Sequence, residues 1–358
     1  MVQQSSTPTL DAQVPIARSH TLPVLSALVL AMIFLQKLAL NFGGGSIGLD
    51  ALLTWAGLGW LFLRREAGLV PLRAGLLLLW LMLIVVSTML TADSARLSAV
   101  AIVLIMYVPF VAQVSLTRRE MLRLFDVYQG AMVAIAVIVL AQQAVQYTIG
   151  NRFWPNLDQL IPARFLYPGF AYIRPYSWDS PWLTPNGVFF LEPSILSSYM
   201  AVAIAIEIIF FQRIRRLALY CVAIVAGVAA SGPVSLVLAS PFLFWRASPR
   251  VRMLMGAGLA ALALFIALGA NFRPLERVSE LSSDNSSAYY RLVKPLQDIG
   301  ATLEEPDILL SGAGAGASPK GDNVVQWPVS KLLYEYGLLV AIVFHLYFLA
   351  AKLDLPEP

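Results

Sequence analysis

This sequence has few charged residues, one cysteine and two histidines, and so lacks most side chains that soluble enzymes use. Only 13% of its 358 residues are charged and 58% are hydrophobic, whereas a typical soluble protein has about 25% charged residues. The single cysteine, Cys221, excludes a disulfide framework and a thiolate metal site. The two histidines, His20 and His345, are too far apart for the short-spaced pair of a zinc site. With no GxxxxGK[ST] loop either, we predict a protein that uses no metal and no cofactor.

Long apolar stretches take the place of these features. Several are long enough to cross a bilayer as single helices. We therefore predict an all-α fold, a polytopic membrane helical bundle of about ten transmembrane helices with two long outer loops. The predicted spans are 22–41, 46–63, 74–91, 96–115, 124–147, 193–211, 217–231, 233–245, 253–271 and 332–350.

Arginines predict how this bundle is oriented. Four connections between spans hold three arginines each, whereas the tight turns at 43–45 and 92–94 hold none. An arginine at the bilayer centre costs roughly 2.5–3.5 kcal/mol, and arginine-rich loops stay in the cytoplasm. Ten spans with both termini in the cytoplasm put all four clusters inside, which explains the net charge of +4 without nucleic acid. The clusters are Arg64, Arg65, Arg73; Arg118, Arg119, Arg123; Arg213, Arg215, Arg216; and Arg246, Arg250, Arg252.

The predicted organisation alternates membrane and aqueous segments. The N-terminal tail has no clean cleavage site, so we expect it to lead into an uncleaved signal-anchor. The predicted segments are a cytoplasmic tail (1–21), spans 1–5 (22–147), a first outer loop (148–192), spans 6–9 (193–271), a second outer loop (272–331), span 10 (332–350) and a cytoplasmic tail (351–358).

One pair of spans has two interpretations. Spans 217–231 and 233–245 are short, and Gly232–Pro233 between them is either a turn or a kink within one helix. A kink would put Arg246 and the arginines after it outside, so the arginine pattern favours a turn.

Charged residues within the spans are few. Antiparallel packing of spans 1 and 2 would bring Lys37 and Asp50 to the same depth, either as a neutralising ion pair or as functional groups. Glu207 lies within two turns of Arg213, and we expect the two to pair. No chain of Asp, Glu and His crosses the spans, which argues against a proton-coupled transporter.

The first outer loop is rich in aromatic residues and prolines. Flat rings beside isolated charges suit sugars, whose C–H faces pack on aromatic systems, although aromatic belts also mark membrane interfaces. At its end, Pro193 fits the first position of a helix, so Glu192 is expected at the cap, accepting backbone N–H bonds, or in a binding site. The aromatic residues include Trp154, Trp178, Trp182, Tyr167, Tyr172 and Tyr176.

The second outer loop contains an amphipathic segment at 287–303. Its apolar face comprises Leu292, Leu296, Ile299 and Leu303, which Arg291 and Lys294 flank. Such a helix, kinked or started at Pro295, could rest on the membrane with its cations towards a headgroup, or simply have a solvated charged face. Arg273 and Arg277 add cations before it, and the glycines of 311–317, Gly314 among them, could form a nest for a diphosphate.

These residues resemble a known family. Asn186-Gly-Val-Phe-Phe-Leu-Glu-Pro-Ser-Ile-Leu-Ser-Ser-Tyr is similar to the outer-loop-to-helix motif of the O-antigen polymerase/ligase superfamily, in particular its exopolysaccharide polymerase branch. Weaker matches in order are Ala230-Ser-Gly-Pro-Val-Ser, Tyr290-Arg291 with Gly312–Gly316, and Val329-Ser-Lys-Leu-Leu-Tyr-Glu-Tyr-Gly-Leu-Leu. The resemblance spans residues 180–345, to within a few residues.

The resemblance implies a glycosyltransferase that needs no metal. Such proteins transfer a glycan from a polyprenyl diphosphate carrier at the periplasmic face of the bacterial inner membrane, and arginines of both outer loops are thought to bind the diphosphate. The implied partners are therefore the lipid-linked glycan, the bilayer, and a chain-length regulator and flippase of the same pathway. The implied catalytic residues are Arg174, Glu192 and Arg291. The expected substrate contacts are Asp179, Trp178, Trp182, Arg277, Lys294, Gly314 and Asn323.

Two departures from the family pattern keep alternatives open. The ligase branch usually has a histidine before its last outer-to-inner span, where this sequence has Asn323, which favours a polymerase over a ligase. The chain also ends soon after the last predicted span, where relatives usually continue, so an inactive assembly partner is a further alternative. A flippase of lipid-linked sugars should have cations in a cavity within the spans, whereas these lie in the outer loops.

Overall fold

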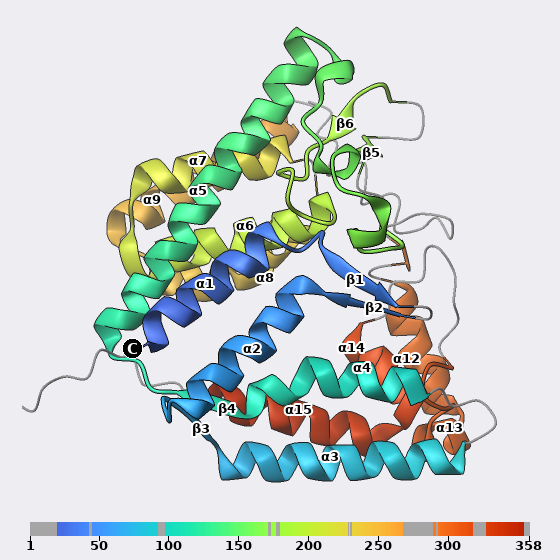
Figure 1. The fold of residues 1–358 in the computed structure, drawn as a ribbon. Helices are drawn as coiled ribbons and strands as arrows, with labels where there is room; N and C mark the ends of the chain where they lie inside the picture. Colours follow the sequence, from blue (N-terminus) through green and yellow to red (C-terminus); the bar gives the residue numbers. More distant parts are fainter. Residues whose placement is uncertain are drawn as a thin grey trace, which may run out of the picture.

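The computed structural model describes most of the chain. The described residues are 20–42, 45–91, 97–170, 173–176, 180–227, 229, 231–267, 289–290, 293–317 and 327–353. Over these residues the protein is mostly helical, as predicted, with three two-stranded antiparallel ribbons that we did not expect (Figure 1).

The described residues form a series of helices and a few short strands. The helices are α1 Thr21–Phe34, α2 Leu49–Leu63, α3 Pro71–Leu90, α4 Leu97–Tyr107, α5 Arg118–Thr148, α6 Pro193–Ile206, α7 Ile214–Ala226, α8 Ser231–Arg246, α9 Pro249–Ala267, α12 Lys294–Glu304, α13 Pro306–Ser311, α14 Pro328–Tyr336 and α15 Leu338–Leu353. The ribbons pair β1 Ala39–Phe42 with β2 Gly45–Gly48, β3 Ala67–Leu69 with β4 Ala112–Val114, and β5 Arg174–Pro175 with β6 Leu183–Thr184.

Three helices of the described chain are long and apolar enough to cross a membrane. They are α3, α5, and α6 together with the π-helical turn Glu207–Phe211 that continues it. Shorter apolar helices are α1, α2 and the segment Leu338–Ala350 of α15. A helix overlaps each predicted span, and the number of membrane crossings stays a prediction.

Three predicted spans were too long, each for a local reason. The first ends at Phe34, and the apolar residues after it form β1, because a short apolar run does not distinguish strand from helix. The span 96–115 stops at Tyr107, before Pro109 in a 3₁₀ turn. The span 332–350 is broken at Gly337, whose φ of 85° and close approach to the Leu310 carbonyl oxygen exclude a side chain.

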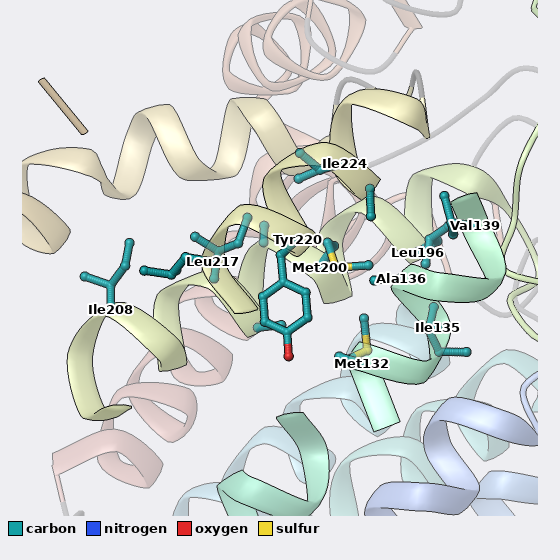
Figure 2. Close-up of a cluster of buried hydrophobic side chains, with 14 of the residues drawn as sticks. Met132, Ile135, Ala136, Val139, Leu196, Met200, Ile208, Leu217, Tyr220 and Ile224 are labelled. Atoms are coloured by element: carbon teal, nitrogen blue, oxygen red, sulfur yellow. The ribbon is translucent and has the colours of Figure 1, made fainter. Parts of the chain in front are cut away.

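Two buried cores divide the helices into two groups. One core joins α1, α5, α6, α7 and α8, and Figure 2 shows Met132, Met200 and Tyr220 converging in it from α5, α6 and α7. The other joins α3, α14 and α15 around Trp80. The Phe344 ring is tilted against the indole ring of Trp80, with 5.1 Å between the ring centroids. The outer connections described below lie across the ends of both groups (Figure 1).

The arginine clusters gather at one end of the bundle. β3 pairs with β4, which brings the end of α2 and the start of α3 to the end of α4 and the start of α5. Asp126 of α5 binds Arg213 and Arg216 at the start of α7, at 2.6 and 3.2 Å. These elements lie on the left of Figure 1, whereas β1–β2, β5–β6 and α12–α14 lie on the right. We call the second side the outer end.

The chain reverses between α7 and α8, which confirms the predicted turn but moves it. Contacts of Arg213 with Asp126, and of Ala226 with Gln143, show that α7 runs parallel to α5. α8 then starts beside the start of α6, where Gly232 N donates to Ser197 Oγ at 3.0 Å. Gly232 and Pro233 therefore belong to the first turn of α8, where proline is tolerated.

The pairing of Glu207 with Arg213 is confirmed. Glu207 is fully buried, and its two carboxylate oxygens accept from Arg213 Nε at 2.8 Å and Nη2 at 3.0 Å. Glu207 begins the π-helical turn, which ends at Phe211, and Gln212 after it is in the left-handed region with φ of 58°. This bidentate pair therefore fixes the tight return from α6 to α7.

Replacing Arg213 by methionine should destabilise the protein strongly. Arg213→Met leaves the buried Glu207 carboxylate without its partner, and breaking such a pair costs about 3–5 kcal/mol. Arg216→Met removes only a contact with the half-exposed Asp126, so it should cost less than about 1 kcal/mol. Thermal unfolding of the detergent-solubilised protein measures both. The double variant Glu207→Met/Arg213→Met should recover most of the loss, and an unchanged Arg213→Met would contradict this account.

Candidate functional site

The candidate site is built on the ribbon β5–β6 at the outer end. Arg174 pairs with Thr184 and Pro175 with Leu183, and the Tyr176 amide continues the ladder by donating to the Trp182 carbonyl at 2.9 Å. Prolines break up the chain around it, so the described residues between 149 and 192 form only short helical turns besides this ribbon. The ribbon therefore depends on neighbouring elements for its position.

Arg174 and Glu192 meet at this ribbon. Arg174 Nη2 lies 2.8 Å from Glu192 Oε1, and the side chains are 41% and 15% exposed. Glu192 stands at the N-cap of α6, but its carboxylate makes no capping bond to the backbone, so of the two predicted alternatives the capping bond is not formed. Its other oxygen, Oε2, accepts from Ser194 Oγ at 2.9 Å instead. The residues of the Glu-Pro-Ser motif thus direct the carboxylate away from the helix axis and towards the arginine.

A strained turn precedes this carboxylate. Gly187 and Val188 both have left-handed backbone conformations, with φ of 63° and 68°. Such a φ is unusual for a β-branched residue and costs on the order of 1–3 kcal/mol. Asn186 supports the turn by accepting from the Val188 amide at 3.0 Å, and the Gln142 side chain accepts from the Gly187 amide at 2.9 Å. Strain held in place by buried amides is typical of a functional site.

Three buried glutamines at the outer end of α5 hold the segment in place. Gln146 clamps Leu183 of β6, accepting from its N–H at 2.9 Å and donating to its C=O at 3.1 Å. Gln143 donates to the Tyr176 hydroxyl and to the Ala226 carbonyl. Gln142 donates to the Pro155 carbonyl at 3.2 Å. These residues were not predicted from the sequence, although three glutamines within five positions of an apolar helix are a signal of a polar contact.

A buried ion pair fixes the start of the same segment. Lys37, only 2% exposed, lies 2.8 Å from Asp158, so the predicted pairing of Lys37 with Asp50 was wrong. Asp50 instead accepts from the Ala51 amide in the first turn of α2. The backbone of Lys37 also accepts from the Tyr167 amide, and Leu38 bridges to Leu166. The connection between α1 and α2 therefore anchors residues 158–167 to the bundle.

The second outer segment contributes an amphipathic helix, α12, which begins with Lys294 and Pro295. Of the two predicted alternatives, Pro295 therefore starts the helix and does not kink it. Lys294 forms an ion pair with Asp298, which raises the pKa of the ammonium. Of the apolar residues, Ile299 packs against the α3–α15 core, whereas Leu296 and Leu303 are 57% and 52% exposed. Lys294 is thus at the outer end, but its charge is already shared with a carboxylate.

The glycine segment packs against α14. The amides of Ala313 and Gly314 donate to the carbonyls of Tyr334 and Glu335. A Cβ at Gly312 would lie 2.4 Å from the Glu335 carbonyl oxygen. Close packing thus explains these glycines, and the amide of Gly314, which we expected to face a diphosphate, is already bound within the protein.

The structure therefore brings part of the predicted site together. Arg174, Glu192 and Trp182 lie on or beside one ribbon, and Lys294 and Gly314 belong to the other outer segment. The described residues contain no group of three or more His, Cys, Asp or Glu side chains that could hold a metal. The remaining predicted site residues, which lie outside the described residues, are Trp178, Asp179, Arg277, Arg291 and Asn323.

Removing the Gln146 amide should loosen the ribbon. Gln146→Leu keeps the volume but leaves the N–H and C=O of Leu183 without their partner, and each group left unpaired costs about 1–3 kcal/mol. Hydrogen–deuterium exchange of residues 180–187 should become about tenfold faster or more. Thr148→Val is the control, because the Thr148 hydroxyl bonds only the Ala144 carbonyl of its own helix. Equal exchange in both variants would contradict a clamping role.

Comparison with protein-family models identifies a family that the chain resembles. The family model of the WcaD colanic acid polymerase matches residues 119–313, which is more than half of the chain and runs from α5 to the glycine segment. No curated protein and no solved structure matches the chain. The match contains Arg174, Glu192 and the three glutamines, and it agrees with the resemblance carried by the Glu-Pro-Ser motif. The chain belongs to the WcaD colanic acid polymerase family.

Proposed function

We propose that this protein polymerises polyprenyl-diphosphate-linked repeat units of an exopolysaccharide at the outer face of the bacterial inner membrane. Membership of a polymerase family supports repeat-unit polymerisation by a glycosyltransferase-like membrane enzyme. The observation that carries the proposal is the Arg174–Glu192 ion pair, which lies within the matched region and at the end of the bundle away from the arginine clusters.

The proposed orientation follows from the same arginines. Arginine-rich segments stay on the cytoplasmic side, so the end that gathers these clusters would face the cytoplasm, with both chain termini. The outer end, with Arg174, would then face the periplasm, where lipid-linked repeat units await polymerisation. Ten transmembrane helices remain our proposed count, with 148–192 and 272–331 as periplasmic loops.

Arg174 would bind the diphosphate of the donor. Within the described part of the chain, its Nε is buried and has no hydrogen-bond partner, so the guanidinium is only partly satisfied by Glu192. A guanidinium binds phosphate as a permanently charged fork. Arg291, the family's second arginine, would share this role, with Arg277 and Lys294 as further cations. Such cations stabilise the charge that develops on the leaving diphosphate.

The reaction is a substitution at the anomeric carbon. The acceptor hydroxyl oxygen forms the new glycosidic bond as the bond to the diphosphate breaks, and that bond's electron pair stays on the diphosphate. The hydroxyl proton needs only a weak base if the sugar becomes oxocarbenium-like, and Glu192 and Asp179 are the candidates. Glu192 also holds Arg174 in place. Trp178, Trp182 and Asn323 would contact the glycan, whereas we leave Gly314 out because its amide is bound.

Other members of the pathway would supply and regulate the reaction. A flippase must deliver the repeat units to the periplasmic face, and a chain-length regulator would limit the polymer. A ligase function is disfavoured because the only histidines of the chain, His20 and His345, lie outside both outer loops. A flippase function is disfavoured because the cations that would bind the diphosphate cluster in the outer loops and not within the spans.

Deleting the gene tests the function directly. Single repeat units should accumulate on the carrier at the outer face, because polymerisation is the missing step. Long lipid-linked polymer without an acceptor would instead indicate a ligase, and units held at the inner face a flippase. Lipid-linked glycans are extracted and their length and sidedness measured. An unchanged profile would contradict the proposal.

Arginine variants test the site. In the deletion strain, Arg174→Ala and Arg291→Ala should each lower polymer synthesis by about 10²–10³-fold, as expected for a lost charge stabiliser. Glu192→Gln should also lower it, because Arg174 loses its ionic partner. Arg164→Ala is the matched control, since Arg164 lies in the same loop with its guanidinium over the Phe165 ring. Near-normal polymer from both Arg174→Ala and Arg291→Ala would refute this site.

A further inference from the structure

Two aromatic rings lie exposed beside the ribbon that carries Arg174. Tyr147, in the last turn of α5, is 57% exposed, and Trp182, next to β6, is 37% exposed. Their ring centroids are 4.8 Å apart and their planes are inclined at 48°. The helix and the ribbon thus contribute one ring each to a small aromatic surface at the outer end, which we call the aromatic pair.

Two tyrosine hydroxyls lie at this pair, and a buried side chain holds one of them. The hydroxyls of Tyr147 and Tyr176 are 3.5 Å apart, and the Tyr176 hydroxyl accepts from the buried side chain of Gln143. Burial raises the pKa of Tyr176 to about 12, so its hydroxyl keeps its proton at physiological pH. The Tyr176 hydroxyl beside the pair is thus held by a buried amide, which anchoring in lipid alone would not require.

The aromatic pair is close to the proposed diphosphate site. Tyr176 follows Arg174 by two positions in the extended chain, and its amide bonds the Trp182 carbonyl. Two residues of strand span roughly 7 Å, and alternate side chains lie on the same side. Arg174 is therefore about 7 Å along the strand from Tyr176, and Trp182 lies opposite Tyr176 in the register of the ribbon.

We propose that Tyr147 and Trp182 form a saccharide platform, on which a pyranose ring of the repeat unit packs through its C–H face. The hydroxyls of Tyr147 and Tyr176 bond the hydroxyls at the edge of that sugar. This inference rests on the proposed function and refines it, because it assigns the glycan a subsite separate from the diphosphate. Stacking on the rings selects a sugar by its flat C–H face and tolerates differences elsewhere in the repeat unit.

Ring-removing and ring-keeping variants test the platform in the full chain, reconstituted in lipid nanodiscs. The probe is the single repeat-unit oligosaccharide released by hydrolysis of the host's exopolysaccharide, and its binding is measured by saturation-transfer NMR. Tyr147→Leu and Trp182→Leu should each weaken binding about tenfold or more, which corresponds to about 1.4 kcal/mol. Tyr147→Phe and Trp182→Phe should stay within about threefold of wild type, because a ring remains for stacking.

The control is Trp245→Leu. Trp245 is 71% exposed near the end of α8, at the other end of the bundle, so its loss should not change binding. Leucine is as soluble in lipid as an aromatic ring, so unchanged binding in the leucine variants would overturn the platform and indicate a membrane belt. A wild-type protein that binds no oligosaccharide would also overturn it. Failure of the polymerase function itself is seen separately, in a deletion strain that still makes polymer.

Discussion

The outer end depends on one constraint: the backbone of a proline-rich segment must find hydrogen-bond partners beside an apolar bundle. Unpaired buried N–H and C=O groups are costly, and the segment 148–192 has little secondary structure to pair its own. Side-chain amides of α5 fill this role, most directly where Gln146 takes up both backbone groups of Leu183. Because these amides come from a helix, the ribbon takes its position from the rigid bundle, and so does the guanidinium of Arg174.

The sequence predicted the helices well where an apolar run was long and its ends were marked. α5 starts with a capping box between Thr117 and Glu120, and α6 starts at Pro193 as predicted. The predicted helix bounds were wrong where an apolar run was short, or where a residue from another part of the chain packs against the run. β1 was included in a helix, and Gly337 breaks the last span because Leu310 of a distant segment approaches it. Such contacts are set by tertiary packing, which periodicity does not record.

The sequence named Arg174 and Glu192 as candidate site residues, but the amides that support the segment around them were missed. The pairing of an arginine with Glu192 could be foreseen from a carboxylate at the start of a helix within a motif. The partner of Lys37 could not be foreseen, because Asp158 lies 121 residues away along the chain. Asp50 is nearer in sequence and was expected at the same depth in the membrane. Gln142, Gln143 and Gln146 carry no charge, so reasoning from buried charges did not single them out. Buried amides beside a segment rich in proline are therefore worth the same attention as buried charges.

The length of α5 explains how one helix connects both ends of the molecule. Its 31 residues span roughly 46 Å at 1.5 Å per residue, compared with a hydrocarbon core of about 30 Å. One end receives Arg213 and Arg216 at Asp126, and the other presents the glutamines and Tyr147. Even when tilted, such a helix reaches past the hydrocarbon, so its last turn can hold polar groups in a wet layer. A sugar bound there would remain next to a diphosphate at the membrane surface, which is where a lipid-linked donor must react.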